Sequence, residues 1–225
     1  QGWKDVVLVP AQQGNVKFIA KFEDFADSEI PYMYHCHILT HEDGGMMGQF
    51  LVEGESALVG PSNQLITIPE GWSSISTYIH PLNSDIIELF SEISDQIIIV
   101  KDYSGSAYLP SWDFNGIGDL TIGQGYQVKS IISQVLDVSG VYSEPSLNAI
   151  QLSPGWNLIG FLPLQAQNTQ LVFENVNVFE NLLIVKDDLG NAYLPSWDFN
   201  GIGDMIPGEG YQVKVLETDY LIYQN

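Results

Sequence analysis

An internal duplication constrains the fold of this chain more than any other feature. The stretch AYLPSWDFNGIGD occupies Ala107–Asp119 and recurs letter for letter at Ala192–Asp204, 85 residues further along. Gly-Tyr-Gln-Val-Lys and Ile-Val-Lys-Asp also occur once in each copy, and Gly-Trp recurs after one insertion or deletion. Self-similarity at a fixed period indicates one structural unit built twice. We therefore interpret the chain as two tandem repeats preceded by a segment that belongs to neither.

The expected organisation is a series of structured units joined by short connections. A segment of a different kind covers residues 1–55. It is followed by a linker at 56–62, a first repeat at 63–131, a second linker at 132–147, a second repeat at 148–216 and a C-terminal tail at 217–225.

The hydrophobic pattern of the first repeat predicts one short helix. In DIIELFSEI, from Asp85 to Ile93, four apolar side chains fall at helical spacing behind Ser84 or Asp85 as the N-cap. The counterpart in the second repeat, residues 170–181, carries three valines. Because β-branched residues fit a strand as well as a helix, helix or strand stays open there.

The rest of the pattern predicts strands. Residues 96–101 and 107–109 indicate a hairpin around a turn at 102–105, and residues 125–131 a closing strand. Before the repeats, residues 16–22 alternate as a half-exposed strand does. We expect a mainly β chain, in which two small α+β modules follow an all-β segment.

Charge excludes several classes of partner. The chain has 28 Asp and Glu against 7 Lys and no Arg, for a net charge of −21. Such a surface repels nucleic acid and anionic lipid headgroups. We expect no membrane span, because no apolar run reaches the roughly 18 residues that one requires. Cys36 is the single cysteine, which excludes an internal disulfide, and the start at Gln1 rather than Met favours a processed product or a fragment.

Metal-binding side chains gather in one segment, YHCHILTHEDGGMMGQF, from Tyr34 to Phe50. On an extended strand, His35 and His37 point to one side and Cys36 to the other. A thiolate, an imidazole and a distant thioether form the ligand set of a blue copper centre, and Cys36, His41 and Met46 supply it. The paired imidazoles then face a second metal site.

This segment resembles the C-terminal copper signature of the multicopper oxidases, the family of laccases, bilirubin oxidases and bacterial copper-efflux oxidases. The resemblance covers about the first 55 residues and implies the last part of a cupredoxin domain, a Greek-key β-sandwich. It implies that Cys36, His41 and Met46 bind type 1 copper, with Met46 as the weak axial ligand. It also implies that His35 and His37 bind part of the trinuclear cluster of type 2 and type 3 coppers.

In that family, a reducing small molecule or metal ion passes electrons in at the type 1 histidine, here His41. The electrons cross through Cys36, and dioxygen is reduced to water. The cluster needs four His-x-His pairs, whereas this chain has one. We therefore expect the C-terminal part of a larger oxidase that is inactive alone, with the other cupredoxin domains in the same polypeptide. The alternative is a non-enzymatic surface binding or display protein with a vestigial single-copper segment.

Other candidates favour structural roles. We expect Met47 to fill a core, His80 to be a solvated turn residue, and Glu42 and Asp43 to form an acidic rim near the copper. The DFNGIGD loops, with Asp113, Asn115 and Asp119 in the first repeat, contain oxygen donors that suit calcium but fit a tight turn better. Tyr and Trp side chains of the duplicated stretch suit a sugar-stacking face, but core positions are more typical; they are Tyr108, Trp112, Tyr193 and Trp197.

The repeats also resemble C-terminal modules of secreted and surface proteins of Bacteroidota, which carry Gly-Trp-Asn-Leu-Ile and Gly-Tyr-Gln-Val-Lys segments. That resemblance implies an accessory role in adhesion or display. A copper thiolate and one unpaired cysteine suit an exported enzyme. We expect the protein to be periplasmic, secreted or attached to the cell surface.

Overall fold

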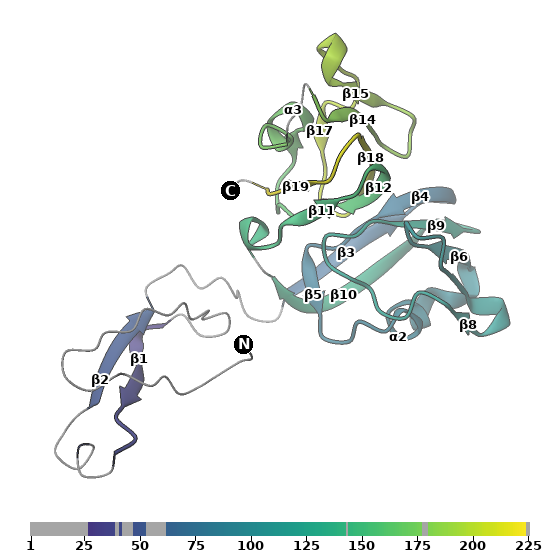
Figure 1. Cartoon of the computed structure of the whole chain (residues 1–225). Coiled ribbons are helices and arrows are strands. Elements are labelled where there is room, and N and C mark those ends of the chain that lie inside the picture. Colours follow the sequence, from purple (N-terminus) through teal and green to yellow (C-terminus); the bar gives the residue numbers. More distant parts are fainter. Residues whose placement is uncertain are drawn as a thin grey trace. The chain divides into compact units, whose positions relative to one another are not determined.

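The computed structural model describes residues 27–38, 41, 47–52, 62–142, 144–176 and 180–223. The chain divides into two compact units, Gln1–Ala57 and Leu58–Asn225, which we describe one at a time (Figure 1). The strand expected at 16–22 lies outside the described residues, as does most of the linker expected at 56–62. Among the described residues, no helix has the length and apolar character needed to cross a membrane.

The first unit contains one antiparallel hairpin. Strand β1 (Asp27–His35) pairs with β2 (Met47–Val52), and the register places His35 opposite Met47. The hairpin therefore brings together the two ends of the segment that carries the metal-binding side chains.

The first repeat is built on a five-stranded sheet with the order β4-β9-β6-β7-β8 and a three-stranded sheet with the order β3-β10-β5. Its elements are β3 (Ser62–Ile68), β4 (Gly71–Ile75), β5 (Ile79–Pro81), α2 (Ile86–Phe90), the 3-10 helix η1 (Ser91–Gln96), β6 (Ile97–Lys101), β7 (Ala107–Leu109), η2 (Pro110–Trp112), β8 (Phe114–Asn115), β9 (Tyr126–Ser130) and β10 (Gln134–Tyr142).

The second repeat has the same five-stranded order, β12-β18-β14-β15-β16, and two pairs of strands, β11-β19 and β13-β17. Its elements are η3 (Pro145–Leu147), β11 (Ile150–Leu152), β12 (Gly155–Gly160), β13 (Gln167–Asn168), α3 (Thr169–Val172), β14 (Leu182–Lys186), β15 (Ala192–Leu194), η4 (Pro195–Trp197), β16 (Phe199–Asn200), β17 (Asp204–Met205), β18 (Gly210–Val215) and β19 (Asp219–Leu221).

The short helix predicted in the first repeat is confirmed. Asp85 is its N-cap, since its Oδ1 accepts a hydrogen bond of 2.7 Å from the Ile87 N–H, and the helix continues as η1. In the second repeat, where the sequence left helix or strand open, Asn168 caps the short helix α3 in the same way. The hairpin of β6 and β7 and the closing strand β9 also lie where they were predicted.

Two segments expected to be connections are strands. The linker expected at 132–147 contains β10, which pairs with both β3 and β5. The tail expected at 217–225 contains β19, which pairs with β11. The two strands are equivalent in the repeats but share little sequence, because a strand that closes a sheet needs only apolar alternation on its inner face. Repeat boundaries drawn from identity therefore stop one strand too early.

Each repeat has its own hydrophobic core. The core of the first repeat includes Phe90, Tyr126 and Val128, and that of the second includes Phe161 and Tyr211. Tyr223 also belongs to the second core, where it is fully buried and donates a hydrogen bond of 2.6 Å to the Gly160 carbonyl. The chain is mainly β, as expected, with several sheets in which short helices are inserted.

The repeats meet through an approximate two-fold relationship. Ile75 forms an isolated antiparallel bridge with Glu209, and Gln124 forms the same kind of bridge with Ile159. Ile75 and Ile159 are equivalent positions of the two copies, as are Gln124 and Glu209. Each repeat therefore offers the same strand ends to the other, which makes the junction self-complementary.

Backbone hydrogen bonds follow the same relationship. The Ser76 N–H donates to the Gly208 carbonyl, and the equivalent Gly160 N–H donates to the Gly123 carbonyl, both at 2.9 Å. The sequence predicts two modules joined by a linker. The described residues of the second unit instead form one compact body, in which the two repeats are hydrogen-bonded to each other.

The glycine of Gly-Tyr-Gln-Val-Lys is explained by this junction. A Cβ atom on Gly125 would lie 2.7 Å from the Ile159 carbonyl oxygen, and one on the equivalent Gly210 would lie 2.9 Å from the Ile75 carbonyl oxygen. Neither distance leaves room for a side chain, so the close approach of the two backbones requires glycine at both positions.

Candidate metal centre

Cys36 and His41 lie together shortly after β1. The strand ends at His35, and the His41 N–H donates a hydrogen bond of 2.8 Å to the Ile38 carbonyl. His41 Nδ1 lies 3.7 Å from Cys36 Sγ. Cys36 is a half-buried free thiol, and His41 is exposed.

The two histidines on either side of the cysteine lie together. The rings of His35 and His37 are stacked, with centroids 4.9 Å apart and an interplanar angle of 23°. Alternation along an extended chain predicts that these two imidazoles share a side while Cys36 points elsewhere. The stacked rings of His35 and His37 agree with the first part of this prediction, even though β1 ends at His35.

The spacing of the Cys36 and His41 side chains fits a metal ion between them. Metal bonds to histidine nitrogen and cysteine sulfur are about 2.0 to 2.3 Å long, so ligand atoms at a trigonal or tetrahedral centre lie about 3.5 to 3.8 Å apart. The 3.7 Å between Sγ and Nδ1 falls in that range. A thiolate with imidazole is also the donor set that copper prefers at trigonal sites.

Part of the predicted metal centre falls outside the residues that the structure describes. Met46 lies outside the described residues, as do Glu42 and Asp43. Within the described part of the chain, no three His, Cys, Asp or Glu side chains form one metal-binding group, because the four ligand candidates fall into two pairs.

Met47 does not fill a core. It lies on β2 opposite His35, and its side chain is 50% exposed. The expectation for this residue is therefore wrong: the side-chain alternation of β2 places it on an exposed face of the hairpin.

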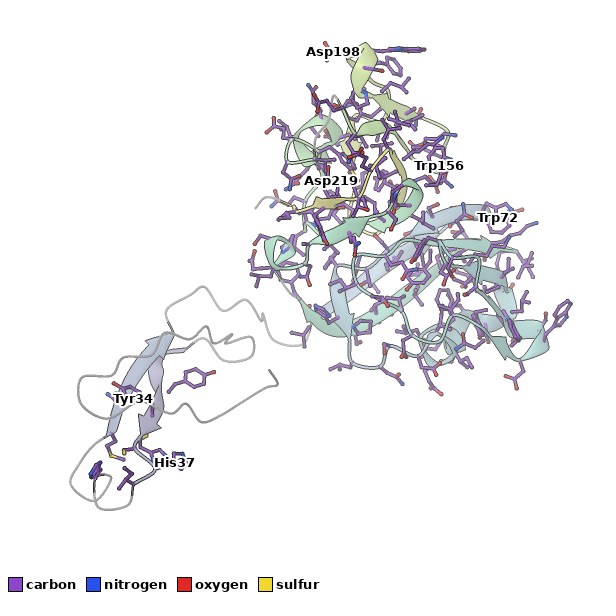
Figure 2. All side chains as sticks on the ribbon, viewed as in Figure 1. Tyr34, His37, Trp72, Trp156, Asp198 and Asp219 are labelled. Carbon is purple, nitrogen blue, oxygen red and sulfur yellow. The ribbon has the colours of Figure 1, made fainter. Side chains whose placement is uncertain are left out.

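One supporting residue was missed by the sequence analysis. Gly48 lies opposite Tyr34 in the hairpin, and the Tyr34 ring occupies the space where a Gly48 side chain would be. Figure 2 labels Tyr34 and His37 on this hairpin. The signal was available, since a glycine in a strand often marks close approach by another group.

The DFNGIGD loops behave as tight turns. Asn115 Oδ1 accepts hydrogen bonds from the N–H groups of Ile117 at 3.0 Å and Gly118 at 2.8 Å. Asp119 accepts one from the Ser84 hydroxyl at 3.1 Å. These oxygens hold the protein's own groups, which supports the turn interpretation over calcium. Asp113 lies in the left-handed region with φ of 48°, as does its equivalent Asp198.

The aromatic residues of the duplicated stretch divide into two groups. Tyr108 and Tyr193 are 3% exposed and belong to the cores, as expected. Trp112 and Trp197 are 76% and 77% exposed, so the core expectation is wrong for them. Each follows a proline in a 3-10 turn that carries its side chain outward.

His80 is exposed as expected but lies in strand β5 rather than a turn, and partial burial lowers its pKa.

Comparisons with known proteins concern the N-terminal segment. Multicopper oxidases of Staphylococcus haemolyticus and Staphylococcus aureus, each named multicopper oxidase mco, are 45% identical to this chain over 53 residues. The enzyme of the same name from Staphylococcus epidermidis is 43% identical over 53 residues. The match covers 23% of this chain and 10% of each relative, so the chain spans about a tenth of their length.

No solved structure matches the chain. The family model described as multicopper oxidase matches residues 1–56, which include the Cys36–His41 contact and the stacked His35 and His37. The N-terminal quarter of this chain is therefore similar to the multicopper oxidase family.

Proposed function

We propose that this chain is the C-terminal part of a copper-dependent oxidase and that residues 1–56 carry a share of its copper sites. The observation that carries the proposal is the placement of Cys36 against His41 beside the stacked pair His35 and His37. These contacts fall inside the segment that is similar to multicopper oxidases.

Each side chain has a distinct role in this proposal. Copper at these residues would supply one-electron redox chemistry. His41 is exposed, so its ring is the edge at which a reducing substrate delivers electrons. Cys36 is joined through the backbone to both His35 and His37. It is therefore the shortest covalent route from the Cys36–His41 pair to the His35–His37 pair. Met46, which lies outside the described residues, would supply a thioether to the copper held by Cys36 and His41.

The overall reaction follows from these roles. A reducing small molecule or metal ion is oxidised one electron at a time, and dioxygen is reduced to water. One His-x-His pair cannot hold three coppers, so further cupredoxin domains of the same polypeptide supply the other histidines. We place the protein in the periplasm or outside the cell, where a copper thiolate enzyme meets such substrates.

The coding sequence upstream of Gln1 tests this proposal directly. We expect a continuous reading frame with three further His-x-His pairs. A frame that opens at once into a signal peptide would contradict an oxidase, because the trinuclear cluster could not form.

A second function is favoured by the repeats. Residues 62–223 make up most of the described chain and have two hydrophobic cores of their own. A surface binding or display protein, with a vestigial copper segment, would use this body as its working part. The upstream frame separates the two, since a display protein predicts more repeats or an early signal peptide.

A further inference from the structure

An exposed tryptophan of the first repeat is flanked by two lysines. Trp72 lies on β4 at the edge of its sheet, and its side chain is 49% exposed. Lys129 lies opposite it on β9, and Lys101 lies on β6, the next strand. Their Nζ atoms are 5.6 and 5.3 Å from the Trp72 ring centroid, within the range of cation–π attraction.

The second repeat has the same arrangement. Trp156 is 50% exposed, and the Nζ atoms of Lys186 and Lys214 lie 5.9 and 5.6 Å from its ring centroid. These lysines and their two equivalents are all the lysines of residues 62–223. None of the four has an ion pair with a carboxylate in the part of the chain that the structure describes. Unpaired cations in a chain of net charge −21 are free to take an anion from outside.

A hollow of about 430 Å³ lies where the outer faces of the two sheets meet. Trp72, Lys101 and Gln127 line it from the first repeat, and Lys186 and Gln212 from the second. Lys101 and Lys186 are equivalent positions, as are Gln127 and Gln212, so each repeat contributes the same lysine and the same glutamine to the hollow. Its volume is in the range of about 300 to 1,000 Å³ that is typical of small-molecule sites.

Two carboxylates also line the hollow but are held by the protein. Asp187 accepts hydrogen bonds from the backbone N–H and the side-chain amide of Asn191, at 2.7 and 2.6 Å. Asp188 accepts one from the Ser74 N–H at 3.3 Å. Their remaining lone pairs suit ligand hydroxyl groups, so the hollow combines cations, amides and hydroxyl acceptors beside an indole face.

We propose that this hollow binds an acidic carbohydrate, in which pyranose rings carry carboxylate groups. The exposed face of Trp72 takes the apolar C–H face of a sugar ring. Lys101 and Lys186 each take a carboxylate in a charge-assisted hydrogen bond. Gln127 and Gln212 form hydrogen bonds with hydroxyl groups of the sugar rings. Figure 2 shows Trp72 and Trp156, the two indoles that hold these lysines.

The acidic surface of the protein does not prevent this binding. At physiological ionic strength, charges more than about 8 Å away from an exposed site are largely screened. The charges that act on a ligand are therefore mainly those that line the hollow. Asp187 and Asp188 offset the two lysines at longer range, so Lys101 and Lys186 attract a ligand carboxylate only in direct contact. Binding should weaken as salt is added, because the ligand charge and the lysine charges are screened as well.

The test uses the full chain and a galacturonic acid trimer, with its methyl ester as the uncharged counterpart. Isothermal titration calorimetry should detect binding of the acid and at least about tenfold weaker binding of the ester. Lys101→Gln with Lys186→Gln should weaken binding of the acid by at least about tenfold. Lys129→Gln with Lys214→Gln is the matched control: it removes the same charge from residues that do not line the hollow, and should cost less than about threefold.

Several outcomes would overturn the proposal. They are equal affinity for the acid and the ester, no heat from the acid, affinity independent of salt, and equal losses in the two lysine pairs. Circular dichroism and thermal melts of each variant report whether it folds. If the Lys101 and Lys186 variant is unfolded, Trp72→Ala in the native background takes its place, and it should also weaken binding of the acid by about tenfold.

Discussion

Gly160 lies against Ser76, its equivalent in the other repeat: a Cβ atom on Gly160 would lie 2.9 Å from the Ser76 Cβ. The two positions meet at the junction, where the Ser76 hydroxyl donates to the Glu209 carbonyl and accepts from the Phe161 N–H. The junction therefore has room for one side chain, which the first copy supplies.

Gly160→Ala should destabilise the chain by about 1 to 3 kcal/mol, because the added methyl group overpacks the junction. Urea denaturation followed by circular dichroism measures this. The exchange Ser76→Gly with Gly160→Ser puts the single side chain on the other repeat and should recover a good part of the loss. A Gly160→Ala variant as stable as the parent would show that the repeats are not in contact here.

Glu209→Gln should stabilise the protein at neutral pH. Burial raises the pKa of Glu209, a Tyr211 hydrogen bond opposes the rise, and the charges of Asp188 and Asp187 add to it. A carboxyl with a raised pKa in the folded state stabilises the fold while it is protonated, and that contribution is lost as pH rises through the folded pKa. The amide of the Glu209→Gln variant does not ionise, so its contribution to stability does not fall as the pH rises.

Thermal melts between pH 4 and 8, a range set by the ordinary pKa of 4.5, check this prediction. The stability gap between Glu209→Gln and the parent should be largest at the upper end and close as the pH falls. Gln124 occupies the equivalent position of the first repeat, so Gln124→Glu is the matched control and should destabilise at neutral pH. A gap that does not change with pH would rule out the carboxylate as its source.

Tyr223→Ala should cost about 3 to 5 kcal/mol, the usual range for an aromatic side chain removed from a core. Tyr223→Phe keeps the ring but removes the hydrogen bond to the Gly160 carbonyl, for a smaller loss of about 1 kcal/mol. Both are measured by chemical denaturation. A free C-terminal tail would instead tolerate either substitution without loss.

Cys36→Ser should weaken binding of cuprous ion by at least about tenfold, since it replaces a thiolate with a poor copper ligand. Competition with a coloured copper chelator measures the affinity of the whole chain. His80→Ala is the control, because His80 lies in the other unit. Unchanged affinity in Cys36→Ser would remove the basis for a copper site at this cysteine.

The sequence predicted the features that depend on local chemistry. The N-cap at Asp85, the hairpin of β6 and β7 and the shared side of His35 and His37 all follow from short-range patterns. Identity between the copies showed that there are two repeats but placed their ends too early. It stops before β10 and β19, which pair with strands far away in sequence.

Long-range packing accounts for the other differences between the predictions from sequence and the structure. Trp112 and Met47 are apolar residues of types common in cores, yet both are exposed, since the direction of a side chain depends on the turn or strand that carries it. The junction of the repeats and the hollow with Lys101 and Lys186 both depend on how one copy is turned relative to the other. No pattern within one copy contains that information.

The self-complementary junction has a consequence for how the duplication arose. A single repeat with Ile75, Gln124 and Gly125 presents the surface that its own copy accepts, so an ancestral one-repeat protein would form a symmetric homodimer. Fusing two copies turns that association into an intramolecular one at millimolar effective concentration. It also frees equivalent residues to differ, as Ser76 and Gly160 now do, which no homodimer allows.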